Sequence, residues 1–147
     1  AIISPPPSKN DKFITSNIEK SSFSNVRKMT TSDIKGKFAK TYIKTLVKNS
    51  KYALALLYPI TGRTHQLRVH MNYIGCSIIG DKKYNLNENF RDNENFLKLH
   101  SYVIKFPNQD FIKAPLPEHF INFMKENKLD INLEKIEKNF EKEFKYE

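Results

Sequence analysis

The sequence has few of the residues on which several protein classes depend. It contains one cysteine, four glycines and no tryptophan, and it has no apolar run of the roughly 18 residues that a membrane helix needs. A single Cys76 excludes an internal disulfide and fits a reducing compartment. With so few glycines there is no glycine-rich phosphate loop. Nothing resembles a signal peptide, so we expect a cytoplasmic protein with no membrane partner.

The charge balance is strongly basic. The 147 residues carry 25 Lys and Arg against 16 Asp and Glu, a formal net charge of +9. This excess favours a polyanionic partner, because each neutralised phosphate releases bound counterions. A genome rich in A and T, which favours Lys, Asn and Ile, would give the same lysine excess. It would not explain why two of only four arginines, Arg63 and Arg68, lie close together.

Composition and periodicity divide the chain into three parts. Residues 1–32 are rich in Ser, Lys and Asn and show no sustained apolar period, so we expect an extended, partly ordered lead-in. Residues 33–127 alternate between strand and helix patterns and form the body. Residues 128–147 are expected to form a C-terminal amphipathic helix, with an apolar stripe at Leu133, Ile136, Phe140 and Phe144.

Alternation predicts a β-hairpin at the start of the body. Residues 38–48 place Ala39, Thr41, Ile43, Thr45 and Val47 on one face. Asn49 and Ser50 supply a turn, and residues 51–58 return as a buried apolar strand. Further strands are expected at residues 77–79 and 96–106, and a helix after Pro117.

Helical spacing follows the hairpin. The pattern predicts a helix that begins near Thr64 and ends at Gly75, a residue that accommodates positive φ. The apolar face of this helix carries Leu67, His70, Met71 and Ile74. The opposite face carries Thr64, His65, Arg68 and Asn72. A short helix thus has an apolar back for a core and a polar, basic front for a ligand.

Five stretches together resemble a known family. They are A-K-T-Y at 39–42, T-G-R-T-H-Q-L-R-V-H at 61–70, G-D-K-K-Y at 80–84, L-K-L-H-S at 97–101 and A-P-L-P-E-H-F at 114–120. In this order they resemble the RluA family of large-ribosomal-subunit pseudouridine synthases, and within it the C-type synthase. The resemblance covers about residues 35–125.

This resemblance implies a fold and a reaction. The expected fold is α+β, a mainly antiparallel mixed sheet with packed helices that forms the C-terminal half of the synthase catalytic fold. The expected activity is isomerisation of uridine to pseudouridine in large-subunit ribosomal RNA, without a cofactor. Ribosomal RNA is therefore the expected partner.

The family's nucleophilic Asp segment, H-R-L-D-x-x-T-S-G, and its K-x-Y motif have no counterpart in this sequence. The chain is therefore expected to be inactive alone and to work with a separate N-terminal half that carries the catalytic Asp. The alternative is a non-catalytic module that binds RNA or protein, or the remnant of a disrupted synthase gene.

The resemblance also assigns site residues. Arg68 corresponds to the active-site Arg, which holds the catalytic Asp ionised, and no Asp of this chain has the context of that partner. Arg63, Thr64 and His65 lie where a helix start favours RNA phosphate, although Thr64 could merely cap the helix and His65 merely orient the turn. Toward the base the expected residues are Tyr84, Leu99 and His100, and for Tyr84 and Leu99 ordinary core packing is an equal or nearly equal alternative.

No metal site is expected. His65 and His70 are about 140° apart around a helix and cannot share one metal ion. His70 falls on the apolar face, as a core histidine with satisfied hydrogen bonds would, and Cys76 fits a small buried apolar residue. The loop at residues 82–95 is either a solvated excursion or a segment that folds over RNA.

Overall fold

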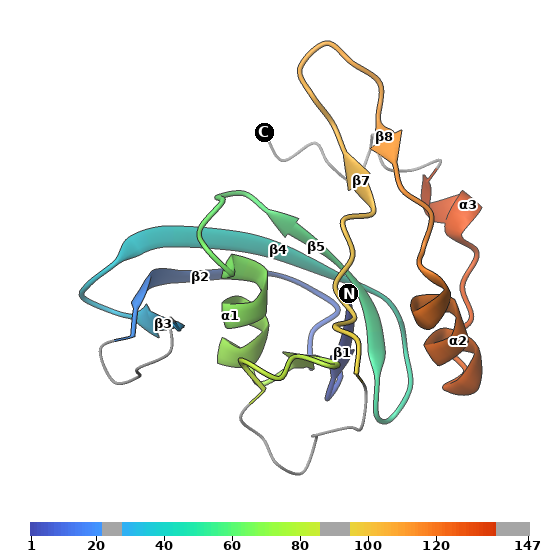
Figure 1. The fold of residues 1–147 in the computed structure, drawn as a ribbon, viewed down its shortest axis with the longest axis horizontal. Helices are drawn as coiled ribbons and strands as arrows, with labels where there is room; N and C mark the ends of the chain where they lie inside the picture. The colour runs from blue at the N-terminus through green and yellow to red at the C-terminus, as the bar shows by residue number, and fades with distance from the viewer. Residues whose placement is uncertain (22–27, 86–94, 138–147) are drawn as a thin grey trace.

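A six-stranded antiparallel sheet organises the computed structural model, which describes residues 1–21, 28–85 and 95–137. The strand order is β3-β2-β4-β5-β1-β6. The strands are β1 (Ile2–Ser4), β2 (Asp11–Lys20), β3 (Met29–Ser32), β4 (Lys37–Lys48), β5 (Ala53–Pro59) and β6 (Ser77–Ile78). The helices are α1 (Gln66–Tyr73), α2 (Glu118–Glu126) and α3 (Leu133–Glu137), and β7 (Val103–Ile104) pairs with β8 (Ile112–Lys113). The predicted α+β class with a mainly antiparallel sheet is confirmed (Figure 1).

Within residues 1–32, where the sequence predicts an extended lead-in, the strands β1, β2 and β3 belong to the sheet. β1 lies between β5 and β6, and Ile2 and Ile3 are both 0% exposed. Their side chains point to opposite faces, Ile3 toward the core under α1 and Ile2 toward the core under α2. A three-residue strand buried on both faces shows no alternation, which is why its pattern is invisible in the sequence.

The predicted hairpin is confirmed as β4 and β5, with one difference in its register. Ala39 and Ile43 are fully buried in the core toward α1, as the alternation predicts. A bulge between Thr45 and Val47 then inserts an extra residue. Val47 therefore packs against the cluster under α2 and not beside Ile43.

Hydrogen bonds of buried polar side chains hold α1 on β4. The Gln66 side chain, 3% exposed as a residue, donates from Nε2 to Lys40 O at 2.9 Å and to Thr41 Oγ1 at 2.9 Å. Its Oε1 accepts from Thr61 Oγ1 at 2.7 Å and from Arg63 N at 3.0 Å. His70, 0% exposed, lies 2.8 Å from Thr41 Oγ1 through Nδ1. Every hydrogen-bonding position of the Gln66 amide is thereby used.

His70 is the satisfied core histidine that its position on the helix predicted. Besides Thr41, its Nε2 lies 3.0 Å from Ser16 Oγ of β2. Burial lowers the pKa of His70 to about 4. The imidazole is therefore neutral at physiological pH and links α1 to two neighbouring strands.

The C-terminal part differs from its predicted elements in length. Of the predicted strand at residues 96–106, only β7 is a regular strand. Before it, Lys98 forms one backbone hydrogen bond with Ile2 and one with Ile79, which do not continue into a ladder. The helix after Pro117 is confirmed as α2. The predicted C-terminal helix is α3 in the described residues, and its stripe positions Phe140 and Phe144 lie outside them. None of the described helices has the length and apolarity that a membrane crossing requires.

Two glycines near α1 offer a matched test of backbone geometry. Gly75 and Gly80 have φ of +75° and +74°, but a Cβ on Gly80 would lie 2.2 Å from Phe96 O while one on Gly75 would meet nothing within 4 Å. We expect Gly75→Ala to lower the free energy of unfolding by about 1–2 kcal/mol, the cost of a left-handed Ala. Gly80→Ala should cost clearly more, because the backbone at Phe96 must also move. Urea denaturation of both variants measures this, and equal losses would contradict the close approach.

The buried His70 predicts a pH dependence of stability. Its pKa is lowered from 6.5 to about 4, so between these values the unfolded chain binds more protons than the folded one. Stability from the neutral imidazole is fully present above pH 6.5 and is lost as the pH falls toward about 4. We expect the urea midpoint to decline over this range in the parent and to decline less in His70→Gln. The same pH dependence in the parent and in His70→Gln would refute the assignment.

Candidate active site

The turn before α1 places His65 in an unusual conformation. His65 precedes the helix with φ 55° and ψ 19°, a left-handed geometry, and its side chain makes no capping bond. It turns instead toward Tyr84, whose hydroxyl lies 2.7 Å from His65 Nδ1. Thr64 does not cap the helix either and is exposed, so the predicted helix start moves two residues along to Gln66.

Arg68 projects from the same side of α1 and has a carboxylate partner within the chain. Arg68 Nε donates to Asp81 Oδ2 at 2.9 Å and Nη2 to Asp81 Oδ1 at 2.7 Å. The Asp81 side chain is 1% exposed and that of Arg68 20%. The expectation that this chain offers Arg68 no partner is therefore wrong. A bidentate pair of this kind fixes the orientation of the guanidinium plane.

The surroundings keep both members of the pair charged. Burial alone would raise the pKa of Asp81, but hydrogen bonds from Arg68 and from the backbone N–H groups of Tyr84 and Lys83 bring it below its usual value. The hydrogen bond to Asp81 raises the pKa of Arg68 above its already high value, against the effect of burial. Asp81 is thus an ionised carboxylate whose oxygens are occupied by four donors.

Tyr84 joins these side chains into one group, which we name the Arg68 cluster: His65, Arg68, Asp81 and Tyr84. Arg68 Cζ lies 4.9 Å from the Tyr84 ring centroid, and the His65 ring meets the Tyr84 ring edge-on at 5.6 Å. The Tyr84 hydroxyl accepts from Met29 N at 3.1 Å, which leaves its hydrogen for His65 Nδ1. Burial and the nearby cations Arg68 and Lys83 lower the pKa of His65, against the effect of Asp81. His65 is therefore neutral and accepts a hydrogen bond from the Tyr84 hydroxyl.

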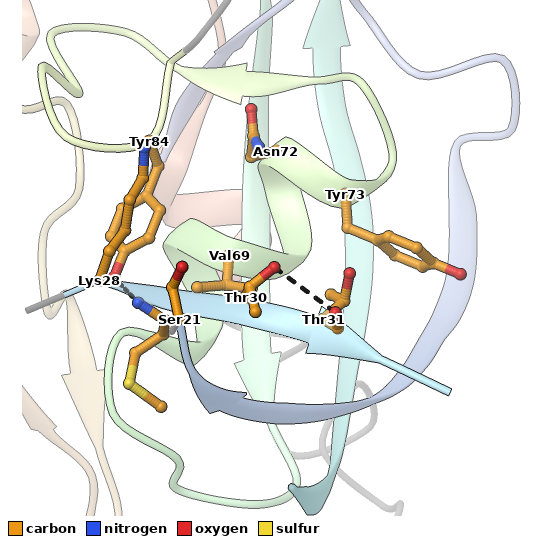
Figure 2. A pocket seen from close by; sticks show the side chains of 9 residues that line it. Ser21, Lys28, Thr30, Thr31, Val69, Asn72, Tyr73 and Tyr84 are labelled. Atoms are coloured by element: carbon orange, nitrogen blue, oxygen red, sulfur yellow. Dashed lines mark hydrogen bonds between the residues drawn. The ribbon is translucent and has the colours of Figure 1, made fainter. Parts of the chain in front are cut away.

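A hollow of about 220 Å³ lies beside the cluster and shares Tyr84 with it (Figure 2). β3 contributes Thr30 and Thr31 to its wall, and α1 contributes Asn72 and Tyr73. Lys28 adds a cation near the Tyr84 ring, with Nζ 5.9 Å from the centroid. Hydroxyls, an amide and an ammonium are groups that bind sugar and phosphate oxygens.

Of the seven predicted site residues, the structure brings together His65, Arg68 and Tyr84, with Arg63 and Thr64 on the adjoining turn. Arg63 Nε donates to Phe38 O at 2.9 Å, which ties the turn to β4. Leu99 packs against the core that contains Met71. His100 instead lies 3.3 Å from Ala114 O and faces the Phe120 ring at 6.1 Å. These contacts place His100 against α2 and not in the Arg68 cluster.

Sequence reasoning missed two residues of the site. Asp81 stands in the G-D-K-K-Y stretch and not in an H-R-L-D context, so the sequence gives no sign that it pairs with Arg68. Gln66 stands in the T-G-R-T-H-Q-L-R-V-H stretch at 61–70. Its four side-chain hydrogen bonds fix the position of α1 on the sheet. In the described part of the chain, no three His, Cys, Asp or Glu side chains gather as a metal ion would require.

Comparison with known proteins identifies similar chains. The family model described as RNA pseudouridylate synthase matches residues 1–73. Ribosomal large subunit pseudouridine synthase C of Buchnera aphidicola is 38% identical over 123 residues, which cover 77% of this chain and 39% of that protein. Ribosomal large subunit pseudouridine synthase D of Borreliella burgdorferi is 34% identical over 120 residues, covering 76% and 36%. The chain thus spans well under half the length of these relatives.

A solved structure has the same arrangement of elements. Human RNA Pseudouridylate Synthase Domain Containing 1 superimposes with a TM-score of 0.69 at 25% identity, over 82% of this chain and 53% of that one.

The Arg68–Asp81 pair predicts strong energetic coupling. We expect a double-mutant cycle of Arg68→Gln and Asp81→Asn, followed by urea denaturation, to give a coupling energy of about 1–3 kcal/mol, because one partner is fully buried. The matched control is the Lys113–Glu137 pair at 2.7 Å, whose side chains are 46% and 25% exposed. Its coupling should stay below about 1 kcal/mol. Coupling of equal size in the two cycles would mean that burial adds nothing.

Proposed function

This chain belongs to the RNA pseudouridylate synthase family, and on that premise we propose that it forms the arginine-bearing part of an active site for uridine isomerisation in large-subunit ribosomal RNA. The observation that carries the proposal is the Arg68 cluster, in which a fixed cation on the first turn of α1 meets residues of separate motifs. In the reaction the bond between uracil N1 and ribose C1′ breaks and the base turns within its site. C5 then bonds to C1′, the C5 proton is lost and N1 gains a proton, so no cofactor is needed.

Arg68 is proposed to hold the carboxylate that performs this chemistry. A guanidinium has five N–H donors, and Asp81 uses the one on Nε and one on Nη2. The other edge can bind a second carboxylate and keep it ionised. Asp81 itself is unsuited to be the nucleophile, because it is 1% exposed and its oxygens already accept four hydrogen bonds. Its role is to orient Arg68.

The nucleophilic Asp is proposed to come from residues outside these 147. The sequence has no H-R-L-D segment, and the chain corresponds to 39% of the Buchnera synthase. We propose that the chain alone is inactive and that a separate N-terminal half supplies the Asp opposite Arg68. That half and ribosomal RNA are the proposed partners, in the cytoplasm.

RNA contacts are proposed along the turn before α1. Arg63, Thr64 and His65 adjoin the Arg68 cluster, and backbone phosphate is the ligand that fits a positive turn at a helix start. Tyr84 is 2% exposed, so it is proposed to act through Arg68 and His65 and not as an open stacking surface. Leu99 is proposed as part of the apolar wall beside the flipped uracil, and His100 as a residue that fixes the Leu99 segment through Ala114.

One observation favours a second function. Because Asp81 satisfies Arg68 within the chain, the cluster needs no partner in order to be stable. A self-contained module that binds RNA or protein without catalysis, or the folded remnant of a disrupted synthase, fits that observation as well. Activity on addition of an Asp-bearing half distinguishes the enzyme from both.

Arg68 should determine the chemical rate, and Arg63 should determine RNA affinity. With a polypeptide that carries the H-R-L-D segment, we expect Arg68→Ala to slow single-turnover release of tritium from [5-³H]uridine RNA by about 10²-fold or more, the scale of losing a preorganised charge partner. Arg63→Ala should weaken RNA binding and spare that rate. The parent chain alone should give background release.

Two results would contradict this proposal. Turnover by the pure chain alone would place the nucleophile within these residues. An unchanged rate for Arg68→Ala at saturating RNA would remove Arg68 from the chemistry.

A further inference from the structure

A row of aromatic rings crosses the sheet on the face turned away from α1. The strand register places Phe13 of β2 opposite Tyr42 of β4, and Tyr42 opposite Tyr58 of β5. The Phe13 and Tyr42 ring centroids are 5.1 Å apart. Their neighbours Ile14 and Ile43 are buried in the core under α1, and successive side chains point to opposite faces of a sheet. The row therefore lies on the other face.

Lysines alternate with these rings along β4. Every second residue of β4 lies on this face, which gives the order Phe38, Lys40, Tyr42, Lys44 at steps of about 6.8 Å. Lys40 Nζ lies 4.4 Å from the Phe13 ring centroid, which confirms that the lysine and the ring share one face. We name the aromatic face by these residues: Phe13, Phe38, Lys40, Tyr42, Lys44 and Tyr58.

Two rings of the aromatic face are open to solvent, and its other residues are half-buried. Phe13 is 44% exposed and Phe38 is 54% exposed. Among the described residues, α2 packs on this side of the sheet against the cluster that contains Ile2, Tyr52 and Leu54, and Leu54 lies four residues before Tyr58 on β5. Figure 1 shows α1 against one side of the sheet and α2 beside the end of the sheet where β5 begins. An exposed group of aromatic rings is unusual on a protein surface and marks a binding site.

We infer that the aromatic face binds single-stranded RNA. Rings that lie on a sheet offer flat surfaces on which unpaired bases stack, and the interleaved lysines sit where the phosphates between those bases would pass. A protein partner fits less well, because the buried centre of a protein interface is depleted in lysine. A duplex also fits less well, because its bases are stacked on one another and hide their faces from the rings.

This second RNA surface extends the proposed function without depending on its chemistry. It rests on RNA as the partner, and it lies across the sheet from Arg68. A substrate whose uridine reached the Arg68 cluster would therefore need another, unpaired segment to occupy the aromatic face. The 147-residue chain provides such a site whether or not an Asp-bearing half is present.

The test is fluorescence anisotropy of the 147-residue chain with a labelled oligouridine at low salt. We expect Phe13→Ile to weaken binding by about 5- to 150-fold, the range for loss of one base–ring stack, while Ile keeps the strand preference. Phe106→Ile removes an equally exposed ring (46%) on the β7–β8 turn and should change little. An abasic oligomer of equal charge should bind the parent more weakly than oligouridine does. It should bind Phe13→Ile and the parent with the same affinity.

The outcomes separate the possible occupants. Equal affinities of parent and Phe13→Ile for oligouridine would overturn the inference and leave the face to a protein partner. Equal affinities of the parent for single strand and duplex would overturn it too. Should Phe13→Ile fail to fold, ultraviolet crosslinking of the parent to 5-bromouridine RNA decides. Crosslinks in β2, β4 or β5 support the site. If every crosslink lies outside these strands, the inference is refuted. Oligouridine binding that depends on Phe13, with no pseudouridine formed when an Asp-bearing half is added, would refute the proposed function and leave this inference standing.

Discussion

The buried amide of Gln66 is the contact on which the site depends. α1 has only eight residues, too few for a stable helix on its own, and two of its four buried side chains are polar. Hydrophobic packing alone would therefore hold it loosely. The Gln66 bonds to Lys40 O and Thr41 Oγ1 fit one position on β4 only, since a shift of one residue would leave buried polar groups unpaired. Because α1 is fixed in this way, His65 and Arg68 at its front are fixed too.

Asp81 converts that fixed helix into a prepared electrostatic site. An arginine side chain loses considerable rotamer freedom when it is ordered, and in this chain folding orders it before any ligand binds. A second carboxylate brought to the outer edge of Arg68 would meet a cation already aligned, so little reorganisation would accompany the chemistry. Tyr84 contributes by covering one side of the guanidinium and by donating its hydroxyl hydrogen to His65. The cluster thus acts as a unit, and its members are spread over motifs that are separate in the sequence.

Much of this architecture could be predicted from the sequence, and the failures have physical causes. Alternation over a dozen residues identified β4, and helical spacing identified α1, because each element has one buried face. β1 was missed because three residues buried on both faces carry no period. The bulge at Thr45 was missed because an inserted residue changes no side-chain type. Asp81 was missed because no periodicity relates it to Arg68; the turn after β6, with Gly80 at positive φ, brings them together.

The alternation of side chains along β4 links the position of α1 to the aromatic face. Odd-numbered residues from Ala39 to Ile43 face α1 and hold it, and even-numbered residues from Phe38 to Lys44 form the opposite face. A register slip of one residue would exchange these sets, so that lysines would enter the core and Thr41 would lose Gln66 and His70. The same hydrogen-bond register therefore maintains both the position of Arg68 and the spacing of the exposed rings. The two faces of this strand cannot change independently, because any shift of the strand would break the buried hydrogen bonds of Thr41 with Gln66 and His70.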